Sequence, residues 1–583
     1  MSKEAEVMKT VVVAMLALCI TAADAKTIRL DPGVRTLERP MVLSAADSGT
    51  RFVGAADGST VISGGVEVKG WTDRGGGVWS APVPKDIWGN SIYFESLFVN
   101  SRRAQRARQP NRGFFHLKRA NHLSLTLEKP EADLFAAVPA SDFPYVHLVG
   151  HCKWDVVRRP VGSFDAATGT ITIPGAELTR WREPVTNEQY FVENLRSAFD
   201  APGEWFYDVA AGEVLYRPLA DEMPETAVFV APRPGLQTLL FVDGATDVEF
   251  ENVTFAHSSP TASQGPSLYE PHQAAEAAPS AVLVNRSRRI SFRNCRFSGT
   301  GGYGLEFRND CVSNSVVSCV FTDLGAGGVR IGPVDARTLP GGNNVTNAIS
   351  ANAVVRPPAA VSFNLVTNCV FRGGGRFHES GIGIFVGHAS DNRIVKNTIE
   401  DFFYTGISVG WVWGYSGSDA QRNLIGWNRI SRIGQKALSD MGGIYTLATS
   451  FGTRIVGNVI TEIDAYSYGG WGIYPDEGSE GIVIEGNYVR DTNSMSFHQH
   501  YGRNNVVRNN DFGRSRQGPV AVTRSEPHVS VVFENNYYDD RLLSGDEPSV
   551  TNYVARTVNV VWRNGGARVP VDVSAAGANL KGK

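Results

Sequence analysis

Short runs in which apolar and polar residues alternate fill the C-terminal half of the chain, and most follow an asparagine. Examples are Asn368-Cys-Val-Phe, Asn397-Thr-Ile, Asn428-Arg-Ile, Asn458-Val-Ile and Asn487-Tyr-Val. From Asn368 to Asn487 the steps are 29, 31, 30 and 29 residues. Alternation at a spacing of two predicts short strands, and the regular repeat predicts stacked units that cannot bury their apolar faces alone.

Asparagine suits the corners of such a stack. It tolerates the left-handed turn conformation, and copies in neighbouring coils can hydrogen-bond to one another. We therefore predict an all-β fold, a right-handed parallel β-helix. In this fold Asn397, Asn428, Asn458 and Asn487 should superpose as a ladder along one corner.

The repeat is interrupted early in the chain. Residues 91–232 carry longer alternating strands with Trp, Tyr and Pro, which indicates an inserted antiparallel β-sandwich-like module. We expect residues 26–90 to form an N-terminal cap and the first coil, and residues 233–583 to form the main β-helix. Irregular segments at 257–281 and 332–359 either cover a functional groove or are surface decoration.

The N-terminus has the pattern of a signal peptide, residues 1–25. Lys9 precedes an apolar run from Val11 to Ile20, and Ala23-Asp24-Ala25 offers small residues at a cleavage site. The run is too short for a permanent membrane anchor, and we find no other stretch that would cross a bilayer. We expect an exported protein, periplasmic or extracellular, with no integral membrane contact.

The bulk composition excludes a strong electrostatic partner. Lys and Arg number 56 against 59 Asp and Glu, a net charge of −3, so we expect no nucleic acid partner, and we expect a monomer. The Arg102-Arg103-Ala-Gln-Arg106-Ala-Arg108 cluster is better explained by ion pairs. Five cysteines remain after cleavage, an odd number that argues against a disulfide framework. Cys295, Cys319 and Cys369 follow turn residues, as small core side chains would.

An outward-facing row of side chains can be read from the strands after the turns. Five segments align, beginning at Gly383, Gly406, Gly443, Gly472 and Ser496. If the second residue of each faces the core, the third faces out. The outward row is then Phe385, Ser408, Tyr445, Tyr474 and His498. Two positions later Asp476 and His500 should be neighbours, because adjacent strands lie about 4.8 Å apart.

This flank has the side chains of a sugar site. Aromatic rings stack on sugars, and a pair of carboxyls supplies acid and base or nucleophile. A single Asp in such a turn is more often an Asx turn, so the clustering carries the argument. The catalytic candidates are Asp440 and Asp476, with Glu477 as the alternate. The substrate-binding candidates are Glu379, His388, Trp411, Tyr445, Trp471, Tyr474, His498 and His500.

Several of these motifs also resemble those of a known family. They are Leu97-Phe-Val-Asn-Ser-Arg-Arg-Ala-Gln-Arg, Asp440-Met-Gly-Gly-Ile-Tyr, Gly469-Gly-Trp-Gly-Ile-Tyr-Pro-Asp-Glu-Gly-Ser and Phe497-His-Gln-His-Tyr-Gly. As a set they resemble glycoside hydrolase family 141, exported bacterial enzymes linked to α-L-fucosidase and xylanase activities. The resemblance implies an oligo- or polysaccharide substrate. It also implies a catalytic pair of aspartates in neighbouring coils, which map onto Asp440 and Asp476.

The alignment leaves a geometric difficulty. It places Asp440 opposite Gly469, seven residues before Asp476, which is ~23 Å along a straight strand. A glycosidase pair is separated by about 5–5.5 Å for retention or about 6.5–9.5 Å for inversion. The chain must therefore bend between the two. If it does not, Asp476 with Glu477 and a partner such as Glu379 is the fallback.

Three other functions fit the same fold. A polysaccharide lyase needs a Lys or Arg base, and Lys396 and Lys436 are the only lysines between Leu239 and Lys581. A non-catalytic binding or adhesin solenoid predicts aromatics spread over many coils. A zinc site from His498, His500, Asp476 and Glu477 would lack a compact spacing motif, so we expect no metal and no cofactor.

Overall fold

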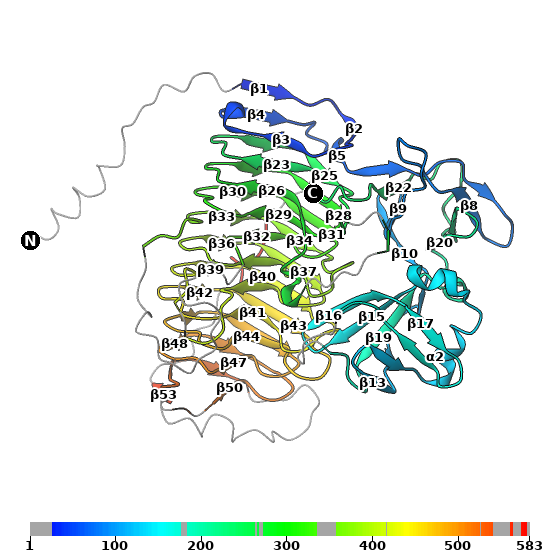
Figure 1. The fold of residues 1–583 in the computed structure, drawn as a ribbon. Helices are drawn as coiled ribbons and strands as arrows, with labels where there is room; N and C mark the ends of the chain where they lie inside the picture. Colours follow the sequence, from blue (N-terminus) through cyan, green and yellow to red (C-terminus); the bar gives the residue numbers. More distant parts are fainter. Residues whose placement is uncertain are drawn as a thin grey trace, which may run out of the picture.

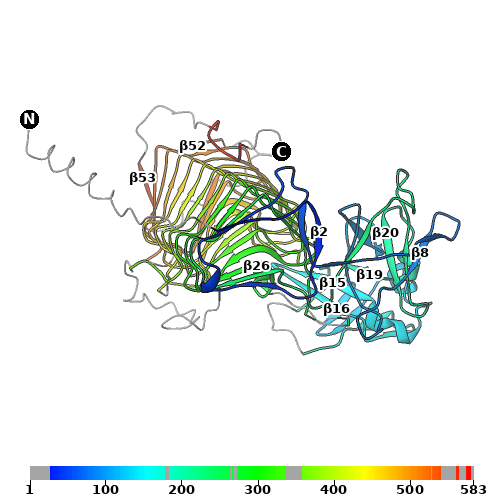
Figure 2. The same ribbon diagram turned by 90° about the horizontal axis from the view of Figure 1, so that it is seen from above.

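The protein forms a parallel β-solenoid beside a smaller, mostly antiparallel module (Figures 1 and 2). The computed structural model describes residues 26–583 except 177–182, 263–264, 267–271, 335–356, 416, 525, 527, 540–559, 564–572 and 580–583. Three parallel sheets of 13, 12 and 11 strands, here called sheets 1, 2 and 3, run the length of the solenoid. The prediction of an all-β right-handed parallel β-helix is confirmed.

Each coil contributes one strand to each sheet. Sheet 1 contains β1 (Lys26–Arg29), β4 (Thr50–Val53), β24 (Glu249–Glu251), β27 (Ser291–Arg293), β30 (Ser315–Val317), β33 (Leu365–Thr367), β36 (Arg393–Val395), β39 (Leu424–Gly426), β42 (Arg454–Val456), β45 (Val483–Glu485), β48 (Asn505–Arg508), β51 (Val531–Glu534) and β53 (Val560–Arg563). Sheet 2 contains β2 (Gly33–Thr36), β5 (Thr60–Ser63), β25 (Thr254–Ala256), β28 (Arg296–Thr300), β31 (Val320–Leu324), β34 (Val370–Arg372), β37 (Thr398–Phe402), β40 (Arg429–Ile433), β43 (Val459–Ile463), β46 (Tyr488–Thr492), β49 (Asp511–Phe512) and β52 (Tyr537–Tyr538). Sheet 3 contains β3 (Met41–Leu43), β23 (Leu240–Asp243), β26 (Ser280–Asn285), β29 (Tyr303–Phe307), β32 (Val329–Ile331), β35 (Ile384–Val386), β38 (Ile407–Val409), β41 (Gly442–Thr446), β44 (Trp471–Pro475), β47 (Phe497–His500) and β50 (Val520–Thr523).

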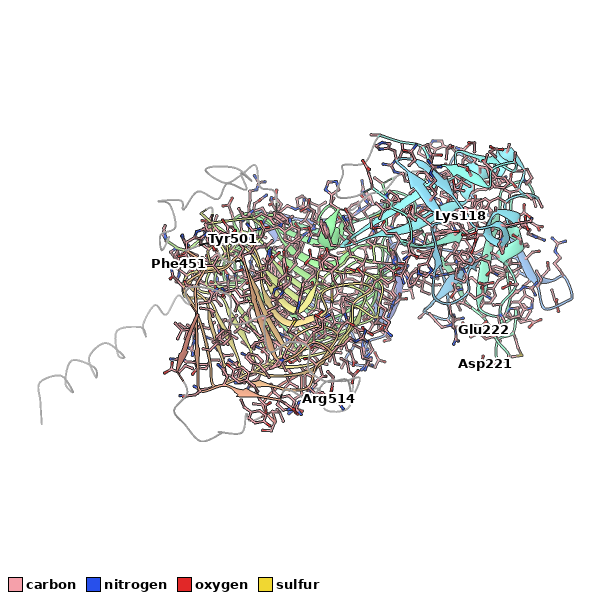
Figure 3. All side chains as sticks on the ribbon, turned by 90° about the horizontal axis from the view of Figure 1, so that it is seen from below. Lys118, Asp221, Glu222, Phe451, Tyr501 and Arg514 are labelled. Carbon is pink, nitrogen blue, oxygen red and sulfur yellow. The ribbon has the colours of Figure 1, made fainter. Side chains whose placement is uncertain are left out.

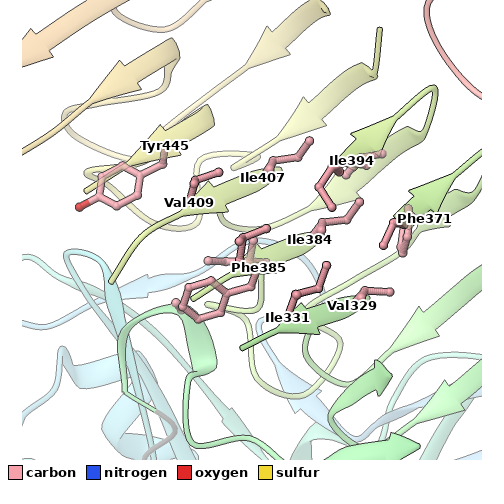
Figure 4. Packing of buried hydrophobic residues seen from close by; sticks show 14 of the residues in the cluster. Val329, Ile331, Phe371, Ile384, Phe385, Ile394, Ile407, Val409 and Tyr445 are labelled. Carbon is pink, nitrogen blue, oxygen red and sulfur yellow. The ribbon is translucent and has the colours of Figure 1, made fainter. Parts of the chain in front are cut away.

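Identical apolar positions stack along the solenoid axis to form its core. In sheet 2 the rings of Phe297, Phe321 and Phe371 stack with centroids 4.4 and 4.5 Å apart. In sheet 3, Ile384 pairs with Ile407 in the next coil. Figure 4 shows this packing from close by. Because each coil covers the apolar face of its neighbour, the register is fixed over the whole stack.

A buried asparagine ladder holds one corner, as predicted. The side-chain amide of Asn397 donates to Asn428 Oδ1 at 3.0 Å, Asn428 donates to Asn458 at 3.0 Å, and Asn458 donates to Asn487 at 2.9 Å. Each oxygen also accepts the backbone N–H of the asparagine before it, as Asn487 Oδ1 does from Asn458 at 2.9 Å. The ladder therefore satisfies backbone donors at a turn where no strand partner is available.

The earlier coils use the corner differently. Asn294 and Asn368 have φ of 53° and 55° and occupy the left-handed turn position itself, whereas Lys396 (φ 59°) occupies it one coil later. The ladder position next to Asn368 is Cys369, whose backbone N–H donates to Asn397 Oδ1 at 3.0 Å. Our alignment of Asn368 with Asn397 is therefore wrong by one residue.

The cysteines that follow the turns are core residues, as expected. Cys295, Cys319 and Cys369 are fully buried and unpaired by disulfides. The Cys319 backbone N–H donates to Cys369 Sγ at 3.4 Å, which shows the stacking. Burial raises the pKa of the Cys295 and Cys319 thiols well above the ordinary value, so both stay protonated.

A second buried ladder, which the sequence analysis missed, runs along another corner. Asn314 donates to Asn364, Asn364 to Asn392 and Asn392 to Asn423, at 2.9, 3.0 and 3.0 Å. These asparagines precede the strands of sheet 1, whereas the first ladder precedes the strands of sheet 2.

The described part of the module contains three sheets, one short α-helix and two 3-10 helices, η2 (Ala140–Tyr145) and η3 (Arg196–Ala198). The eight-stranded sheet contains β6 (Gly65–Glu67), β7 (Thr72–Asp73), β8 (Trp79–Pro82), β9 (Leu97–Val99), β10 (Arg102–Arg106), β20 (Glu204–Asp208), β21 (Glu213–Tyr216) and β22 (Phe229–Pro232). The five-stranded sheet contains β11 (Arg108–Gln109), β12 (Phe115–His116), β15 (His147–Cys152), β16 (Asp155–Pro160) and β19 (Gln189–Glu193). The remaining elements are β13 (Arg119–Asn121), β14 (Ser124–Thr126), β17 (Ser163–Asp165), β18 (Thr170–Thr172) and α2 (Lys129–Asp133).

The module leaves and rejoins the solenoid at adjacent positions. Gly65 in β6 pairs with Pro232 in β22, directly after β5 of the solenoid. Because β6, β7 and β8 pair within the module, it starts at Gly65 and not at residue 91. Figure 3 shows the two parts side by side, with Lys118 on the module and Arg514 on the solenoid. The division into separate domains stays a prediction.

Two expectations depend on segments that are described only in part. The last part of the 257–281 segment contains η4 (Gln273–Ala275) and contacts sheet 3, where Trp411 Nε1 donates to Glu276. Most of 332–359 and the whole signal peptide lie outside the described residues. Among the described helices, none has the length and apolar character needed to cross a membrane.

The ladder gives a direct test of what holds the coils together. In Asn458→Ala, the backbone N–H and the side-chain amide of Asn428 lose their acceptor, Asn458 Oδ1. The Ile425 carbonyl also loses the hydrogen bond that it accepts from the Asn458 amide. Because these groups are buried, we expect the free energy of unfolding to fall by about 2–4 kcal/mol, measured by chemical denaturation. Asn509→Gly is the control, since Asn509 is exposed with φ 55° and glycine adopts that conformation. Equal losses in both variants would contradict the ladder's role.

Candidate active site

The strands of sheet 3 bring the predicted outward row together. Tyr445 pairs with Tyr474, and because Ile473 pairs with Phe497, Tyr474 lies beside His498. The Tyr474 and His498 rings stack at 5.2 Å and 4°, and Trp471 lies 4.1 Å from Tyr474. The row is a continuous aromatic surface across β41, β44 and β47, and Figure 4 shows Tyr445 at the edge of the core.

Asp476 lies at the end of this row. Its Oδ2 accepts from the Tyr445 hydroxyl at 2.7 Å, and its Oδ1 pairs with His500 Nδ1 at 2.8 Å. Although burial opposes it, the hydrogen bond with Asp476 raises the pKa of His500. A carboxylate that accepts a hydroxyl and pairs with an imidazolium is stabilised in its ionised form.

Asp440 reaches the same place from a loop. It lies between β40 and β41 with φ 53°, and its backbone N–H donates to the Tyr468 carbonyl at 3.0 Å. Its carboxyl accepts from the hydroxyls of Tyr474 at 3.0 Å and Tyr468 at 3.3 Å. The loop therefore turns the Asp440 side chain toward the aromatic row.

Two packed tyrosines link the two carboxyls. Tyr474 donates to Asp440 at 3.0 Å, Tyr445 donates to Asp476 at 2.7 Å, and the centroids of the two rings are 5.2 Å apart. Burial first, and then the charges of Asp476 and Asp440, raise the pKa of Tyr474 well above its usual value, as expected for a ring beside both carboxyls. Gly469 and Gly470, with φ of 86° and 71°, bend the chain between them, so the straight ~23 Å path is not taken.

The environment makes the two carboxyls unequal. Burial, together with the neighbouring charge of Asp476, raises the pKa of Asp440 to about 7. Asp440 is therefore mostly protonated below pH 7 and about half protonated at pH 7, whereas Asp476 accepts from Tyr445 and pairs with His500. Unequal carboxyls of this kind can serve as acid and base, or as acid and nucleophile. Burial, followed by the charge of His500, lowers the pKa of His498 to about 3, so its ring is neutral.

Glu477 lies beside the pair without joining it. Burial and the charge of Asp476 raise the pKa of Glu477, while His500 and Arg524 oppose the shift. Its hydrogen bond in the structure is made by its backbone carbonyl, which accepts from Ala448 at 3.1 Å.

Three predicted binding residues lie elsewhere. Glu379 is ion-paired with His151 of the module and lines a cavity of about 610 Å³ between module and solenoid. His388 follows β35, three strands of sheet 3 before β44. Trp411 is buried against Phe385 at 4.9 Å and donates to Glu276. The sequence placed them on one flank, but the turn after β34 meets the module at Glu379, the turn after β35 meets Pro333 at His388, and the turn after β38 meets the 257–281 segment at Trp411.

The sequence analysis missed several neighbours of Asp440. Tyr468 bonds its carboxyl, and the Tyr404 hydroxyl donates to its carbonyl oxygen at 3.2 Å. Gln273 donates to Tyr404 at 3.1 Å, so the 257–281 segment reaches the site. The sequence contains a signal for both tyrosines, because each lies just before an aligned strand. Tyr404 lies two residues before Gly406, and Tyr468 directly precedes Gly469.

The rival lyase and zinc chemistries would use a lysine or arginine base and a cluster of metal ligands. Within the described residues, neither Asp440 nor Asp476 forms an ion pair with a lysine or an arginine, and Lys436 instead pairs with Asp464 at 3.7 Å. The described residues also contain no group of three or more His, Cys, Asp or Glu side chains able to hold a metal ion.

Comparisons with known proteins agree with this fold. A family described as a right-handed β-helix region matches residues 238–469. A solved structure named "Glycoside hydrolase" is 23% identical, with a TM-score of 0.72, covering 83% of this chain and 89% of that one. The xylose complex of XylC is 11% identical with a TM-score of 0.44, covering 93% and 81%.

More distant likenesses exist as well. The adhesin PfbA of Streptococcus pneumoniae is 12% identical with a TM-score of 0.31, covering 54% of this chain and 82% of that one. No curated protein sequence matches the chain. The match to the 23% identical structure, with its TM-score of 0.72, establishes a shared fold alone.

The raised pKa of Asp440 predicts a pH-dependent cost in stability. The folded carboxyl binds its proton more tightly than the unfolded one, so the free energy of unfolding falls as pH rises from about 4 to about 7. Asp440→Asn removes this cost, and asparagine tolerates φ 53°. We expect the variant to gain on the order of 2 kcal/mol over wild type between pH 5 and pH 8.

Thermal unfolding at the two pH values measures this gain. Asp491→Asn is the control, because Asp491 is a surface residue with φ 57° that pairs with Arg514 at 3.1 Å. Its effect should be the same at pH 5 and pH 8. A difference between Asp440→Asn and wild type that does not change with pH would show that Asp440 titrates normally.

Proposed function

We propose that this protein is a glycoside hydrolase in which Asp440 is the general acid and Asp476 is the nucleophile or base. The observation that carries the proposal is the pair of packed tyrosines that bond the two carboxyls, Tyr474 to Asp440 and Tyr445 to Asp476, with the pKa of Asp440 raised to about 7. A carboxyl that keeps its proton beside a second carboxyl that pairs with a histidine provides the two groups that cleavage of a glycosidic bond requires.

The chemistry follows from the two environments. Asp440, in its protonated form, gives its proton to the leaving-group oxygen as the glycosidic bond breaks. Asp476 either attacks the anomeric carbon or takes a proton from the attacking water. His500 and Tyr445 hold the Asp476 oxygens, and Tyr474 and Tyr468 hold the Asp440 carboxyl.

Aromatic side chains beside the pair support a sugar substrate. Trp471, Tyr474 and Tyr445 form the wall next to the carboxyls, while Tyr468 and part of His500 are accessible to solvent. Rings of this kind stack on the C–H faces of pyranoses. The substrate is therefore an oligo- or polysaccharide.

Further details of the proposal come from the sequence. The resemblance to glycoside hydrolase family 141 favours an α-L-fucosidase or xylanase type of activity, and the name of the 23% identical structure is consistent with a glycosidase. The signal-peptide pattern of residues 1–25 favours action in the periplasm or outside the cell, and the protein would act as a monomer without a cofactor.

Substitution of either aspartate tests the proposal. Released sugars are measured with fucosylated glycans, xylan and pectin-derived glycans for wild type, Asp440→Asn and Asp476→Asn. Each variant keeps the shape but loses proton or nucleophile chemistry, so we expect turnover to fall by about 10³-fold or more while circular dichroism stays unchanged. Asp491→Asn should retain full activity.

Two outcomes would overturn this proposal. Near-normal turnover in both variants would make the pair structural. Products that carry a new C4–C5 double bond, seen by ultraviolet absorbance, would identify a lyase, and tight glycan binding without turnover in wild type would identify a binding solenoid.

The pH profile of wild-type activity gives an independent prediction. Because Asp440 must be protonated to act as acid, kcat/KM should fall as pH rises through about 7. The fall should be close to tenfold per pH unit above that value. A profile that stays flat from pH 6 to pH 9 would show that another group delivers the proton.

A further inference from the structure

A hairpin of the module touches the loop that carries Asp440. Strands β15 and β16 are joined by Lys153 and Trp154, and in Figure 1 β16 meets the solenoid beside β43. The carbonyl of Lys153 accepts from the backbone N–H of Ser439 at 2.7 Å, one residue before Asp440. His151 Nδ1 lies 3.0 Å from the carbonyl oxygen of Ala437. The module therefore reaches the site from outside the solenoid.

The module also holds the surroundings of this loop. The side-chain amide of Gln189 faces the carbonyl oxygens of Lys436 and Ala437, and with its nitrogen turned to that side it donates to them at 3.1 and 3.2 Å. The Tyr466 hydroxyl donates to the Asn187 carbonyl at 3.0 Å. Both loops that position Asp440, 434–441 and 464–470, are thus bonded to the module.

The hairpin is firmly docked. Val149, Val156 and Phe191 of the module are buried in the same apolar cluster as the solenoid core, and Trp154 packs against that cluster. Closely packed apolar contacts of this kind do not slide, because small shifts open cavities. Lys153 adopts φ 58° at the hairpin tip, a conformation that a non-glycine residue holds when its surroundings fix it.

His151 is the side chain through which the contact is made. A carbonyl oxygen only accepts, so Nδ1 must carry the proton that it donates to Ala437. The other ring nitrogen bonds Glu379, which is held in turn near Arg158 and Arg108. The ring is thereby fixed between the solenoid on one side and the Asp440 loop on the other.

We propose that the antiparallel module completes the active site, with the β15–β16 hairpin fixing the Asp440 loop and His151 acting as a positioning residue. This inference rests on the proposed function. Within the solenoid, Asp440 is supported from the following coil, where Tyr468 accepts its N–H and Tyr474 bonds its carboxyl. The hairpin supplies support on the opposite side. An acid must lie within about 0.5 Å of its productive position, and a 1 Å displacement can cost about 100-fold in rate.

Two substitutions of one residue separate the contacts of His151. In His151→Asn the amide replaces Nδ1, so the bond to Ala437 is kept and the bond to Glu379 is lost. In His151→Gln the amide replaces Nε2, so the bond to Glu379 is kept and the bond to Ala437 is lost. We expect His151→Gln to lower kcat about 10–100-fold with KM within about twofold. His151→Asn should stay within about threefold of wild type.

The pH profile tests positioning separately from general damage. If the loop relaxes in His151→Gln, the Asp440 carboxyl becomes better hydrated and farther from Asp476, so its pKa falls toward the ordinary value. The alkaline limb of kcat/KM should then move to lower pH, while that of His151→Asn stays in place. Equal kcat and equal alkaline limbs in the two variants would overturn the proposal.

A measurement that needs no substrate tests the positioning of Asp440 independently of the proposed function. Thermal stability is measured at pH 5 and pH 8 with and without Asp440→Asn, in wild-type, His151→Gln and His151→Asn backgrounds. The gain is the extra stability that Asp440→Asn brings at pH 8 relative to pH 5. The gain should shrink by half or more with His151→Gln and persist with His151→Asn. An unchanged gain in both overturns the positioning role. A gain that behaves as expected, with no hydrolysis of any glycan, upholds the positioning of Asp440 and overturns the glycosidase.

Discussion

The structure depends on the stacking of one coil on the next in exact register. A single coil buries its apolar residues only when its neighbours cover them, and the asparagine ladder supplies partners for backbone donors at the turns. A shift of one residue would turn the core positions to the surface. Because this register is fixed, Tyr445, Tyr474 and His498 are held in one row.

The site combines a residue at the end of a solenoid strand with a residue on a loop. Asp476 is fixed at the end of a core strand, whereas Asp440 is brought in by a turn with positive φ. Two carboxyls close together cannot both be ionised cheaply, and burial together with the charge of Asp476 favours the proton on Asp440. Asp476 differs because it pairs with His500, whereas Asp440 is bonded by the hydroxyls of Tyr474 and Tyr468. The catalytic asymmetry therefore follows from the different partners of the two carboxyls.

The sequence repeat made the fold and the row of aromatic side chains predictable. The period of apolar residues sets the fold, and the alignment on Gly443 and Gly472 gives the outward row, because side chains in stacked strands repeat in register. The neighbour relation of Asp476 and His500 follows in the same way. The one-residue misalignment at Asn368 arose because asparagine fits two adjacent corner positions for different reasons, the left-handed turn and the ladder.

Other features depend on contacts between distant parts of the chain. The bend at Gly469 and Gly470 that brings Asp440 to Asp476 has no periodic signal. The separation of Glu379 from the pair depends on His151, which is 228 residues away in sequence. Alternation of apolar residues identifies the module's strands, but it does not show which hairpin docks on the solenoid.

The central claim is that the Asp440 carboxyl, beside Asp476, keeps its proton up to about pH 7. Infrared difference spectra of wild type minus Asp440→Asn, recorded from pH 4 to pH 9, report this directly through the carbonyl stretch of a protonated carboxylic acid. The account predicts a band that persists at pH 6 and disappears with a midpoint near pH 7. Loss of the band with a midpoint near pH 4 would show that Asp440 is an ordinary carboxylate and would contradict the account.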